Sequence, residues 1–262
     1  MNHSFIVLAY KNSEYIEDLF DSLFAQTEHS EIQVATSTPT DALRQKAERY
    51  GLKVRVNPVA GGIASDWNFA YETARTDCVT LAHQDDLYEP DFTKRTMAAF
   101  RAAKDPILVY TNYFEIRPEG RTYANRLLRI KRLMNLPVGA FPKSPWVRNH
   151  VFAFGCPVSC PSVTYNKKRF PDFRFSGDYK NDLDWEAWHR LAAEPGEFIY
   201  LPTPLIGHRI HDESETTNSI LSGVRSREDL EMFRKYWKNE KWIRFLHRLY
   251  EGGMKSNDIE EP

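Results

Sequence analysis

The sequence has little that would attach it to nucleic acid or carry it across a membrane. It balances 35 Lys and Arg against 36 Asp and Glu, so no overall attraction to nucleic acid is expected. No segment approaches the roughly 18 consecutive apolar residues of a membrane-spanning helix. The first apolar run, 5–10, is followed by Lys11 and Asn12 and is too short for a secretory signal. We therefore expect a cytoplasmic protein that does not bind nucleic acid.

Cysteine is also scarce. The chain has three cysteines, Cys78, Cys156 and Cys160, and a small, odd number is typical of a reducing compartment. Cys156 and Cys160 lack the second Cys or His pair that a structural zinc site needs. We expect these cysteines to be small buried side chains.

The first hundred residues alternate strand and helix patterns. The continuous apolar run 5–9 is typical of a strand covered on both faces, and 15–24 repeats apolar residues at helical spacing. Strands are expected at 5–9, 31–35, 52–56 and 78–82, and helices at 14–24, 41–50, 65–74 and 91–103. This order predicts an α/β fold with a Rossmann-like, mostly parallel central sheet flanked by helices. Such sheets bind ligands at the carboxyl ends of their strands.

The pattern changes after residue 110. Residues 117–150 are basic and predicted to be irregular, and 121–132 is a candidate flap over the site. Further elements are expected as a β-rich segment at 151–165, a helix at 184–193, strands at 198–201 and 205–210, and helices from 225 onward. We divide the chain into a first half at 1–110, a second half at 111–215 and a C-terminal helical extension at 216–262.

Two adjacent carboxylates, Asp85 and Asp86, follow directly after the predicted strand 78–82. Neighbouring carboxylates repel each other, and a divalent cation removes that repulsion. Mg²⁺ and Mn²⁺ prefer carboxylate and phosphate oxygens, so a metal that also bridges nucleotide phosphates suits this position. The alternative is a solvated acidic turn before the next helix. The place at the end of a buried parallel strand favours the metal site.

Four short motifs, in this order, resemble those of family 2 glycosyltransferases of the bacterial type, which have the GT-A fold. The first two are Ala9-Tyr10-Lys11-Asn12 and Ser22-Leu23-Phe24-Ala25-Gln26-Thr27. The other two are the spaced set Asn57, Gly62 and Asn68, and the pair Asp85-Asp86 with Pro90 four residues on. The resemblance covers residues 4–110 strongly and 150–215 weakly. It implies that residues 1–110 bind a nucleotide-sugar.

The resemblance implies roles for individual residues. Asp86 would be the main metal ligand, Asp85 would lie near the ribose or the metal, and His211 would complete the shell of a Mn²⁺ or Mg²⁺ ion. The implied donor-binding residues are Ala9, Tyr10, Asn12, Thr36, Ser37, Gly61, Gly62, Ser65, Asn68, Asp85 and Arg209. Arg209 would contact the diphosphate, and the two glycines would let backbone approach the nucleotide closely.

The chain departs from the family pattern at several positions. Many relatives carry Asp-Asp after the second strand, where the first Asp contacts uracil, but this chain has Thr36 and Ser37 there. Their hydroxyls can bond to a base without charge. His83 replaces the first acid of the commoner Asp-x-Asp-Asp form, and Trp67 stands where relatives often carry Arg. A UDP-hexose is the donor implied by the resemblance alone.

Residues 181–191 resemble the acidic motif that supplies the base in this family. Inverting transfer needs a carboxylate that accepts the proton of the attacking hydroxyl. Matching Trp188 and Arg190 to the aromatic and basic positions of the motif places Asp184 at the base, with Asp182 as the alternative. Either Asp would otherwise serve as a cap for the helix that starts here.

The segment 225–250 is basic and aromatic at helical spacing. It predicts an amphipathic helix or helix pair that docks on the core or on another copy of the chain, as in a homo-oligomer. The alternative is peripheral contact with the inner face of the plasma membrane, where a lipid-linked acceptor would lie.

The sequence therefore predicts a metal-dependent, inverting hexosyltransferase. Its donor would be a nucleotide-sugar, and its acceptor a hydroxyl of a glycan, glycolipid or glycoprotein. One alternative is a catalytically silent relative that acts as a binding or assembly subunit. A sugar-phosphate nucleotidyltransferase is disfavoured, because residues 9–13 lack the Gly-rich basic loop expected after its first strand.

Overall fold

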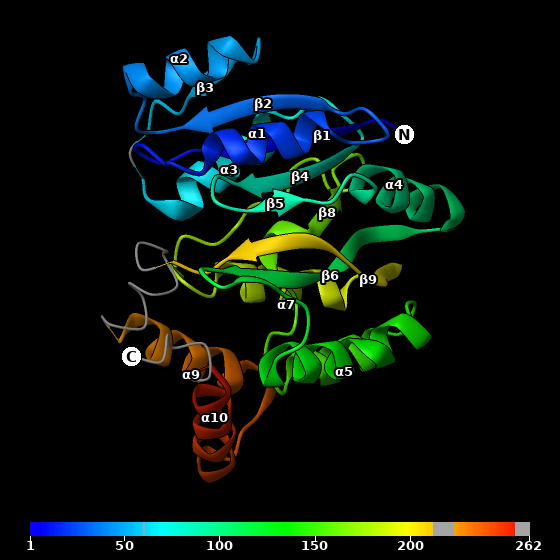
Figure 1. Cartoon of the computed structure of the whole chain (residues 1–262). Helices are drawn as coiled ribbons and strands as arrows, with labels where there is room; N and C mark the ends of the chain where they lie inside the picture. Colours follow the sequence, from blue (N-terminus) through cyan, green and yellow to red (C-terminus); the bar gives the residue numbers. More distant parts are fainter. Residues whose placement is uncertain (60, 212–222, 255–262) are drawn as a thin grey trace.

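The structure is a computed structural model that describes residues 1–59, 61–211 and 223–254. Within these ranges the chain forms one mixed sheet with the strand order β3-β2-β1-β4-β8-β6-β9-β5, and β7 pairs with β6. Helices pack around this sheet, from α2 at the top of Figure 1 to α5, α9 and α10 at the bottom. The expected boundary between residues 215 and 216 lies outside the described residues.

The amino-terminal half is the parallel part of the sheet. Its strands are β1 (His3–Leu8), β2 (Glu31–Thr36), β3 (Val54–Val56) and β4 (Cys78–His83). Its helices are α1 (Ile16–Phe24), α2 (Asp41–Arg49) and α3 (Ile63–Thr73). β1 pairs in parallel with both β2 and β4, which confirms the predicted order of strands and helices. The carboxyl ends of these neighbouring strands therefore lie at one edge of the sheet.

The rest of the sheet consists of strands that run in both directions. They are β5 (Leu87–Tyr88), β6 (Pro106–Arg117), β7 (Gly120–Thr122), β8 (Val163–Asn166) and β9 (Glu197–Arg209). β9 is one long strand that includes both of the short strands expected from the sequence. β5 begins right after Asp86 and pairs antiparallel with the end of β9, with Tyr88 opposite Ile206. This pairing brings the end of β9 beside the acidic pair.

Residues 117–150, which were expected to be irregular, are mostly helical. α5 (Arg126–Ala140) and α6 (Pro145–Phe152) fill this segment. The side chain of Asn125 accepts the Leu128 N–H at 2.8 Å and so starts α5. Pro137, inside α5, disfavours a helix by local propensity. Tertiary packing overrides that propensity, because α5 buries one apolar face against the sheet.

The β-rich interpretation of residues 151–165 is also wrong. α6 extends to Phe152, a short 3₁₀ helix spans Cys160–Ser162, and the strand β8 begins only at Val163. The apolar residues of this segment are buried whether or not they lie in strands, and an apolar run alone does not distinguish the two cases.

Apolar side chains fill both faces of the sheet and fix the strands. Phe5 and Val7 of β1 belong to the cluster that includes α1, whereas Ile6 belongs to the cluster on the opposite face. This alternation follows from the two-residue period of a strand. Each fully buried side chain of this size contributes about 1.5–3 kcal/mol to stability. The strand ends that carry the polar residues are thus rigidly held.

The C-terminal helices pack on the core. α9 (Val224–Tyr236) and α10 (Glu240–Met254) lie together at the bottom of Figure 1. The ring of Phe233 lies 5.3 Å from that of Trp185 in α7 (Leu183–Ala193), and Ile243 of α10 is buried. The C-terminal helical extension predicted from the sequence is therefore confirmed. No helix in the described ranges is long and apolar enough to cross a bilayer.

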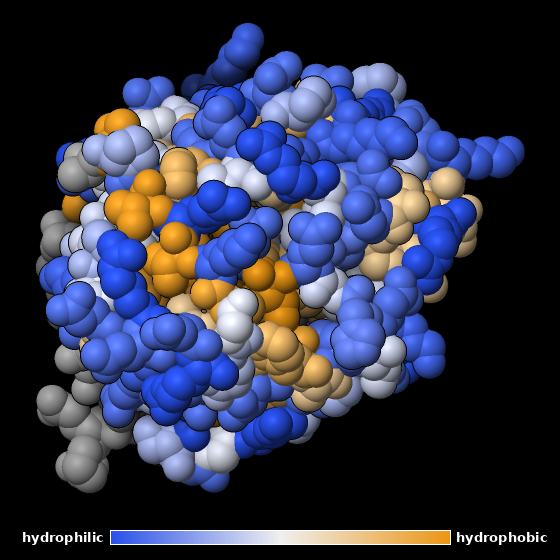
Figure 2. Space-filling model, turned by 90° about the horizontal axis from the view of Figure 1, so that it is seen from above, coloured by the Kyte–Doolittle hydropathy of each residue, from blue (hydrophilic) through white to orange (hydrophobic). Residues whose placement is uncertain are grey.

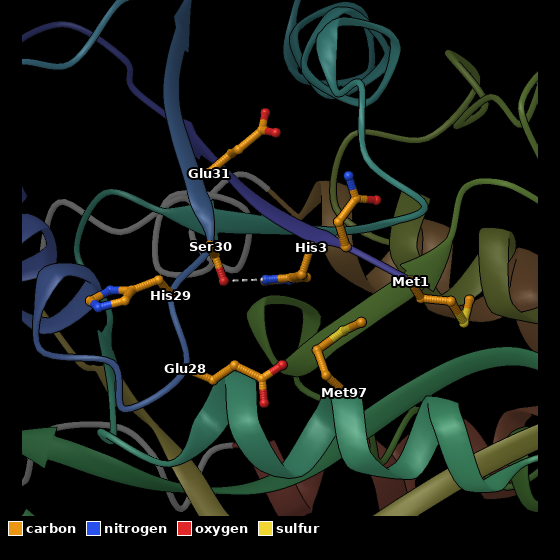
Figure 3. Close-up of a pocket in the computed structure, with 8 residues that line it drawn as sticks. Met1, His3, Glu28, His29, Ser30, Glu31 and Met97 are labelled. Atoms are coloured by element: carbon orange, nitrogen blue, oxygen red, sulfur yellow. Dashed lines mark hydrogen bonds between the residues drawn. The ribbon is translucent and has the colours of Figure 1, made fainter.

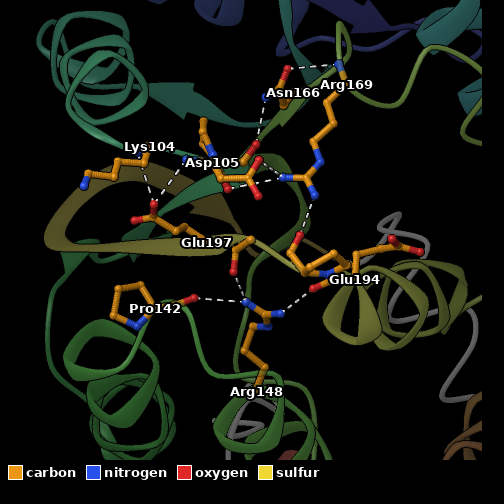
Figure 4. Close-up of polar contacts among 11 residues, drawn as sticks. Lys104, Asp105, Pro142, Arg148, Asn166, Arg169, Glu194 and Glu197 are labelled. Carbon is orange, nitrogen blue, oxygen red and sulfur yellow. Dashed lines mark hydrogen bonds and ion pairs between the residues drawn. The ribbon is translucent and has the colours of Figure 1, made fainter.

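A buried arginine joins α6 to the connection between α7 and β9. The guanidinium of Arg148 donates to the carbonyl oxygens of Pro142 at 3.0 Å, Gly196 at 2.7 Å and Glu194 at 2.7 Å (Figure 4). It also donates to the Ala192 carbonyl at the end of α7. Arg148 thus satisfies main-chain oxygens that would otherwise be buried without donors.

We predict that Arg148→Met destabilises the fold by about 3 kcal/mol, because several buried carbonyls lose their donors. Urea unfolding, compared with the parent, measures this loss. The matched control is Lys143→Met, which removes an exposed cation from the same region and should change stability by less than about 0.5 kcal/mol. A change of that small size for Arg148→Met would contradict the structural role.

Candidate active site

The acidic turn after β4 is bonded to the end of β9. Asp86 is fully buried, and its Oδ1 accepts from His208 Nδ1 and from the Arg209 main-chain N–H, each at 3.0 Å. Its second oxygen, Oδ2, is also buried and has no hydrogen-bond partner in the described part of the chain. Asp86 therefore fixes the position of β9 relative to the turn.

Asp85 and His211 form a more accessible pair at the same edge. Asp85 Oδ2 lies 2.9 Å from His211 Nε2, and the two side chains are 22% and 19% exposed. Burial opposes ionisation of Asp85, but the hydrogen bond from His211 and the nearby histidines lower its pKa below the usual value. A carboxylate oxygen and an imidazole nitrogen thus converge where the sequence predicts the metal.

The donor atoms present suit a divalent cation that also binds its substrate. Among the described residues, no group of three or more His, Cys, Asp or Glu is arranged to hold a metal. Mg²⁺ commonly binds through one or two carboxylates and completes its octahedron with substrate phosphates and water. Asp85 supplies one such carboxylate and His211 a nitrogen. The neighbouring residue Asp86 has a buried oxygen, Oδ2, without a hydrogen-bond partner among the described residues. The residues therefore fit the ion that the sequence implies.

Arg209 lies next to this pair. Its Nε donates to the Asp85 carbonyl at 3.0 Å, and its guanidinium lies 4.3 Å over the ring of Tyr15. A second guanidinium nitrogen contacts Asp18 at 3.1 Å. The cation predicted to contact the diphosphate is thus held beside the acidic pair.

His83 lies on the other side of the turn. Its ring is 5.3 Å from that of Trp67, and burial lowers its pKa. Two of the positions where the chain departs from the family pattern, Trp67 and His83, therefore pack against each other.

The loops after β1, β2 and β4 are bonded to one another. The Tyr10 N–H donates to Gln84 Oε1 at 2.9 Å, and the Gln84 amide donates back to the Tyr10 carbonyl at 3.2 Å. The Lys11 N–H donates to Thr38 Oγ1 at 2.6 Å, and Asn12 accepts from Thr40 at 2.6 Å. The predicted donor-binding loop 9–12 therefore lies beside the residues after β2, as the parallel order requires.

A carboxylate that the sequence analysis missed lies in the region expected to bind the nucleobase of the donor. Asp66, in the first turn of α3, accepts from Ser37 Oγ at 2.7 Å and from Asn57 Nδ2 at 2.9 Å. Thr36 is buried at the end of β2 and Ser65 Oγ lies 3.2 Å from Asn57 Nδ2. The charge absent from the loop after β2 is thus supplied from α3.

The glycines before α3 have a local structural role. Gly62 is the residue that precedes the helix and has φ 80°, a conformation that glycine adopts without strain. A Cβ on Gly61 would lie 2.7 Å from Ser65 Cβ. Asn68, also predicted to bind the donor, instead uses its amide group on the main chain of Phe175, at 2.7 and 2.9 Å.

The predicted base lies in the first turn of α7. Burial, together with the nearby Asp182 carboxylate, raises the pKa of Asp184 to about 7, although the Trp185 N–H donates to Asp184 Oδ1 at 2.6 Å. Asp182 is the residue that precedes α7, and its side chain makes no capping hydrogen bond. Burial raises its pKa as well. The capping alternative for Asp182 is therefore wrong.

The cap of this segment comes from α9. The Glu228 carboxylate accepts the main-chain N–H groups of Lys180, Asn181 and Asp182, at 3.0, 2.8 and 3.0 Å. Glu228 is itself buried. The C-terminal extension thus holds the loop that leads to Asp184.

Lys131 of α5 is a second residue that the sequence analysis missed. Its ammonium lies 5.3 Å over the ring of Tyr113, which in turn faces His208 at 6.2 Å. Its positive charge acts on both Asp184 and His208 and offsets a small part of the upward shift in the pKa of each. The charge of Lys131 therefore acts on the predicted base and on the histidine that bonds to the acidic turn. Lys131 was missed from the sequence because an irregular flap was expected where the structure has the helix α5.

A cavity of about 430 Å³ lies elsewhere, at the amino ends of β1 and β2. Figure 3 shows its labelled lining, in which His3 points to Ser30 and Met97 enters from α4 (Phe92–Ala102). His3 bonds to Ser30 Oγ at 2.8 Å and to Thr80 Oγ1 at 2.9 Å, and burial lowers its pKa to about 3. A neutral histidine with both nitrogens engaged is structural, so the carboxyl edge remains the candidate site.

Comparison with known proteins identifies the family of this chain. The model of the family described as Glycosyl transferase family 2 matches residues 4–156, more than half of the chain. A search of curated proteins found no sequence match. The solved structures with similar folds include S. aureus TarS 1–349 in complex with UDP-GlcNAc, which is 18% identical with a TM-score of 0.62 over 98% of this chain and 73% of that chain.

Two further structures were solved with Mn²⁺. The mannosyltransferase PcManGT from Pyrobaculum calidifontis, in complex with GDP-Man and Mn²⁺, is 15% identical with a TM-score of 0.66 over 98% of this chain and 70% of that chain. Glucosyl-3-phosphoglycerate synthase from Mycobacterium tuberculosis is 15% identical with a TM-score of 0.55 over 86% and 79%. These likenesses confirm the GT-A fold. The chain belongs to glycosyl transferase family 2 and is a nucleotide-sugar glycosyltransferase.

Proposed function

We propose that this enzyme is a metal-dependent, inverting glycosyltransferase in which Asp184 is the base. The observation that carries the proposal is the half-buried carboxylate of Asp184, whose pKa is raised to about 7. The charge of Lys131 acts both on Asp184 and on His208, the histidine that bonds to the acidic turn. A base works best when its pKa lies near the working pH. The acceptor is a hydroxyl of a glycan, glycolipid or glycoprotein.

Asp85 and His211 would hold the metal, with Asp86 keeping the turn and β9 together. This assignment gives Asp85 the role of main ligand, because Asp85 is accessible and Asp86 has one oxygen committed to β9. When bound, Mn²⁺ or Mg²⁺ would offset the negative charge of the diphosphate leaving group. Arg209 would add a fixed positive charge beside it.

Asp184 would accept the proton of the acceptor hydroxyl as that oxygen attacks the anomeric carbon. Burial keeps the base partly protonated at neutral pH, so its ionised form is a stronger base than an exposed Asp. Glu228 holds the preceding loop, which limits the positions that Asp184 can occupy. A carboxylate base of this kind would serve a single-displacement transfer, in which the acceptor attacks on the face opposite the leaving group.

We propose that Asp66, Ser37 and Thr36 form the pocket for the nucleobase of the donor, called here the base pocket. A uracil N3–H donates a hydrogen bond, and a carboxylate is its strongest acceptor. A uridine-linked hexose is therefore the first donor to test. Trp67 and His83 replace residues that are common in the family, and they pack against each other. The contacts to the diphosphate would therefore differ here from those of other family members.

We predict that Asp66→Asn weakens binding of the nucleoside diphosphate by about 10- to 150-fold, because a hydrogen bond to a charged acceptor contributes about 1.5–3 kcal/mol. Calorimetric titration of UDP measures the change. Asp41→Asn is the control, an exposed Asp at the start of α2. Equal UDP affinities for Asp66→Asn and the parent would remove Asp66 from the base pocket.

The donor itself is identified by calorimetry with a panel of nucleotide-sugars, with and without Mn²⁺. Binding of one donor only in the presence of metal supports the proposal. If no donor binds under any condition, the silent-relative alternative replaces it.

A further inference from the structure

The end of the molecule formed by α5 and α10 exposes apolar side chains that the core does not use. On α5, Ile130, Leu133 and Leu136 are 40%, 65% and 50% exposed. They lie on the face opposite Leu128 and Val138, which are buried against the sheet. An exposed apolar stripe of this kind on a helix marks an interaction surface.

α10 carries a second stripe of the same kind. Trp242, Phe245 and Leu249 are all exposed, and the first two rings stack at 5.3 Å. The other face of α10 already supplies Ile243 and Leu246 to the core. The stripe is therefore an additional apolar face, not one required for folding.

Exposed cations flank both stripes. α5 contains no Asp or Glu, and the exposed Glu240 at the start of α10 is paired with Arg234. Arg126, Arg129 and Arg132 lie exposed along the α5 stripe. On α10, Lys241, Arg244 and Arg248 are exposed beside Trp242, Phe245 and Leu249.

The opposite end of the molecule differs. Seen from above, hydrophilic side chains cover most of the surface around a central group of apolar ones, with further apolar groups toward the edges (Figure 2). In Figure 1, this end carries α2 and β3, and α5 and α10 lie at the bottom. The α5 and α10 stripes thus lie at the end of the molecule away from α2 and β3.

We propose that the α5–α10 surface, defined by Ile130, Leu133, Leu136, Trp242, Phe245 and Leu249 with their flanking cations, docks on an anionic lipid bilayer. Apolar side chains enter the interface while Lys and Arg contact acidic headgroups. A second copy of the chain suits this surface less well. Two copies related by a two-fold axis would present the same positive face to each other.

The surface also lies close to the site. α5 carries Lys131 on its inner side and Leu133 on its outer side. On the proposed function, docking would present a membrane-held acceptor near Asp184. Vesicle binding needs no catalysis, so its result is independent of the proposed chemistry.

The test is co-sedimentation of the full chain with vesicles of phosphatidylcholine, with or without 30% phosphatidylglycerol. We expect binding to the anionic vesicles only, falling as salt is raised. The double variant Leu133→Glu/Leu136→Glu and the triple variant Arg126→Gln/Arg129→Gln/Arg132→Gln should each lower it at least tenfold. Matched controls are Phe24→Glu on α1 and Arg44→Gln on α2, both exposed positions.

Absence of binding by the parent, or equal binding to neutral and anionic vesicles, overturns the proposal. So does a parent that forms dimers which Leu133→Glu/Leu136→Glu dissociates, with no vesicle binding. The salt dependence of the parent does not rely on any variant folding correctly, and thermal melting confirms that each variant is folded.

Discussion

Replacing Asp184 with Asn should lower kcat by about 10²–10⁴-fold, the usual contribution of a general base. Asn has nearly the same shape but accepts no proton at neutral pH. Donor affinity should change little, because Asp184 acts on the acceptor. Steady-state kinetics with the donor identified by calorimetry give kcat, and direct titration gives the affinity.

The pH profile distinguishes this role from a structural one. The parent's kcat/KM should rise with pH through about 7, because Asp184 must lose its proton to act. The charge of Asp182 contributes to the raised pKa, so Asp182→Asn should move the rise to lower pH. A profile with no rise near pH 7, or an Asp182→Asn profile that moves upward, would contradict the assignment.

Stability provides the control. The pKa of Asp184 in the folded chain, about 7, lies above the ordinary 3.8, so the ionised form disfavours folding and stability falls as pH rises from about 4 to about 7. Asn carries no charge to bury. Asp184→Asn at pH 8 should therefore be at least as stable as the parent, and lost activity cannot be attributed to unfolding.

Replacing Asp85 with Ala should weaken Mn²⁺ binding by at least about 10²-fold and remove most of the transfer activity, because loss of a second-sphere partner alone costs 10–100-fold. Calorimetric titration of Mn²⁺ with donor present measures it. Asp77→Ala is the matched control, since Asp77 precedes the same strand at its opposite end and pairs with Lys168. It should leave metal binding unchanged.

Asp86→Asn separates the two adjacent acids. We expect it to lower stability, because Asp86 Oδ1 accepts from His208 and from the main chain of Arg209. Its effect on metal affinity should be smaller than that of Asp85→Ala. The reverse order would make Asp86 the main ligand, as the motif alone implies.

The parallel half of the fold was predictable because its signals are local. The apolar run 5–9 and the apolar face of 15–24 each lie within one element. The acidic pair was visible for the same reason, as it directly follows a buried strand. The prediction that polar residues gather at this edge, where ligands bind in such sheets, needed only the βαβ order.

The missed residues depend on contacts distant in sequence. Asp66 accepts a hydrogen bond from Ser37, 29 positions away in the sequence. Glu228 accepts one from the main-chain N–H of Asp182, 46 positions away. α5 was missed for another reason. Pro137 lies within it and disfavours a helix locally, and only packing on β9 shows that the helix continues.

The most direct test of inverting transfer with Asp184 as base is the anomeric configuration of the product. With the identified donor and water as acceptor, proton NMR can follow the released sugar before it mutarotates. The account predicts a sugar of configuration opposite to that in the donor, formed by the parent and not by Asp184→Asn. Release with retained configuration would contradict it, because a single displacement with Asp184 as base cannot produce that outcome.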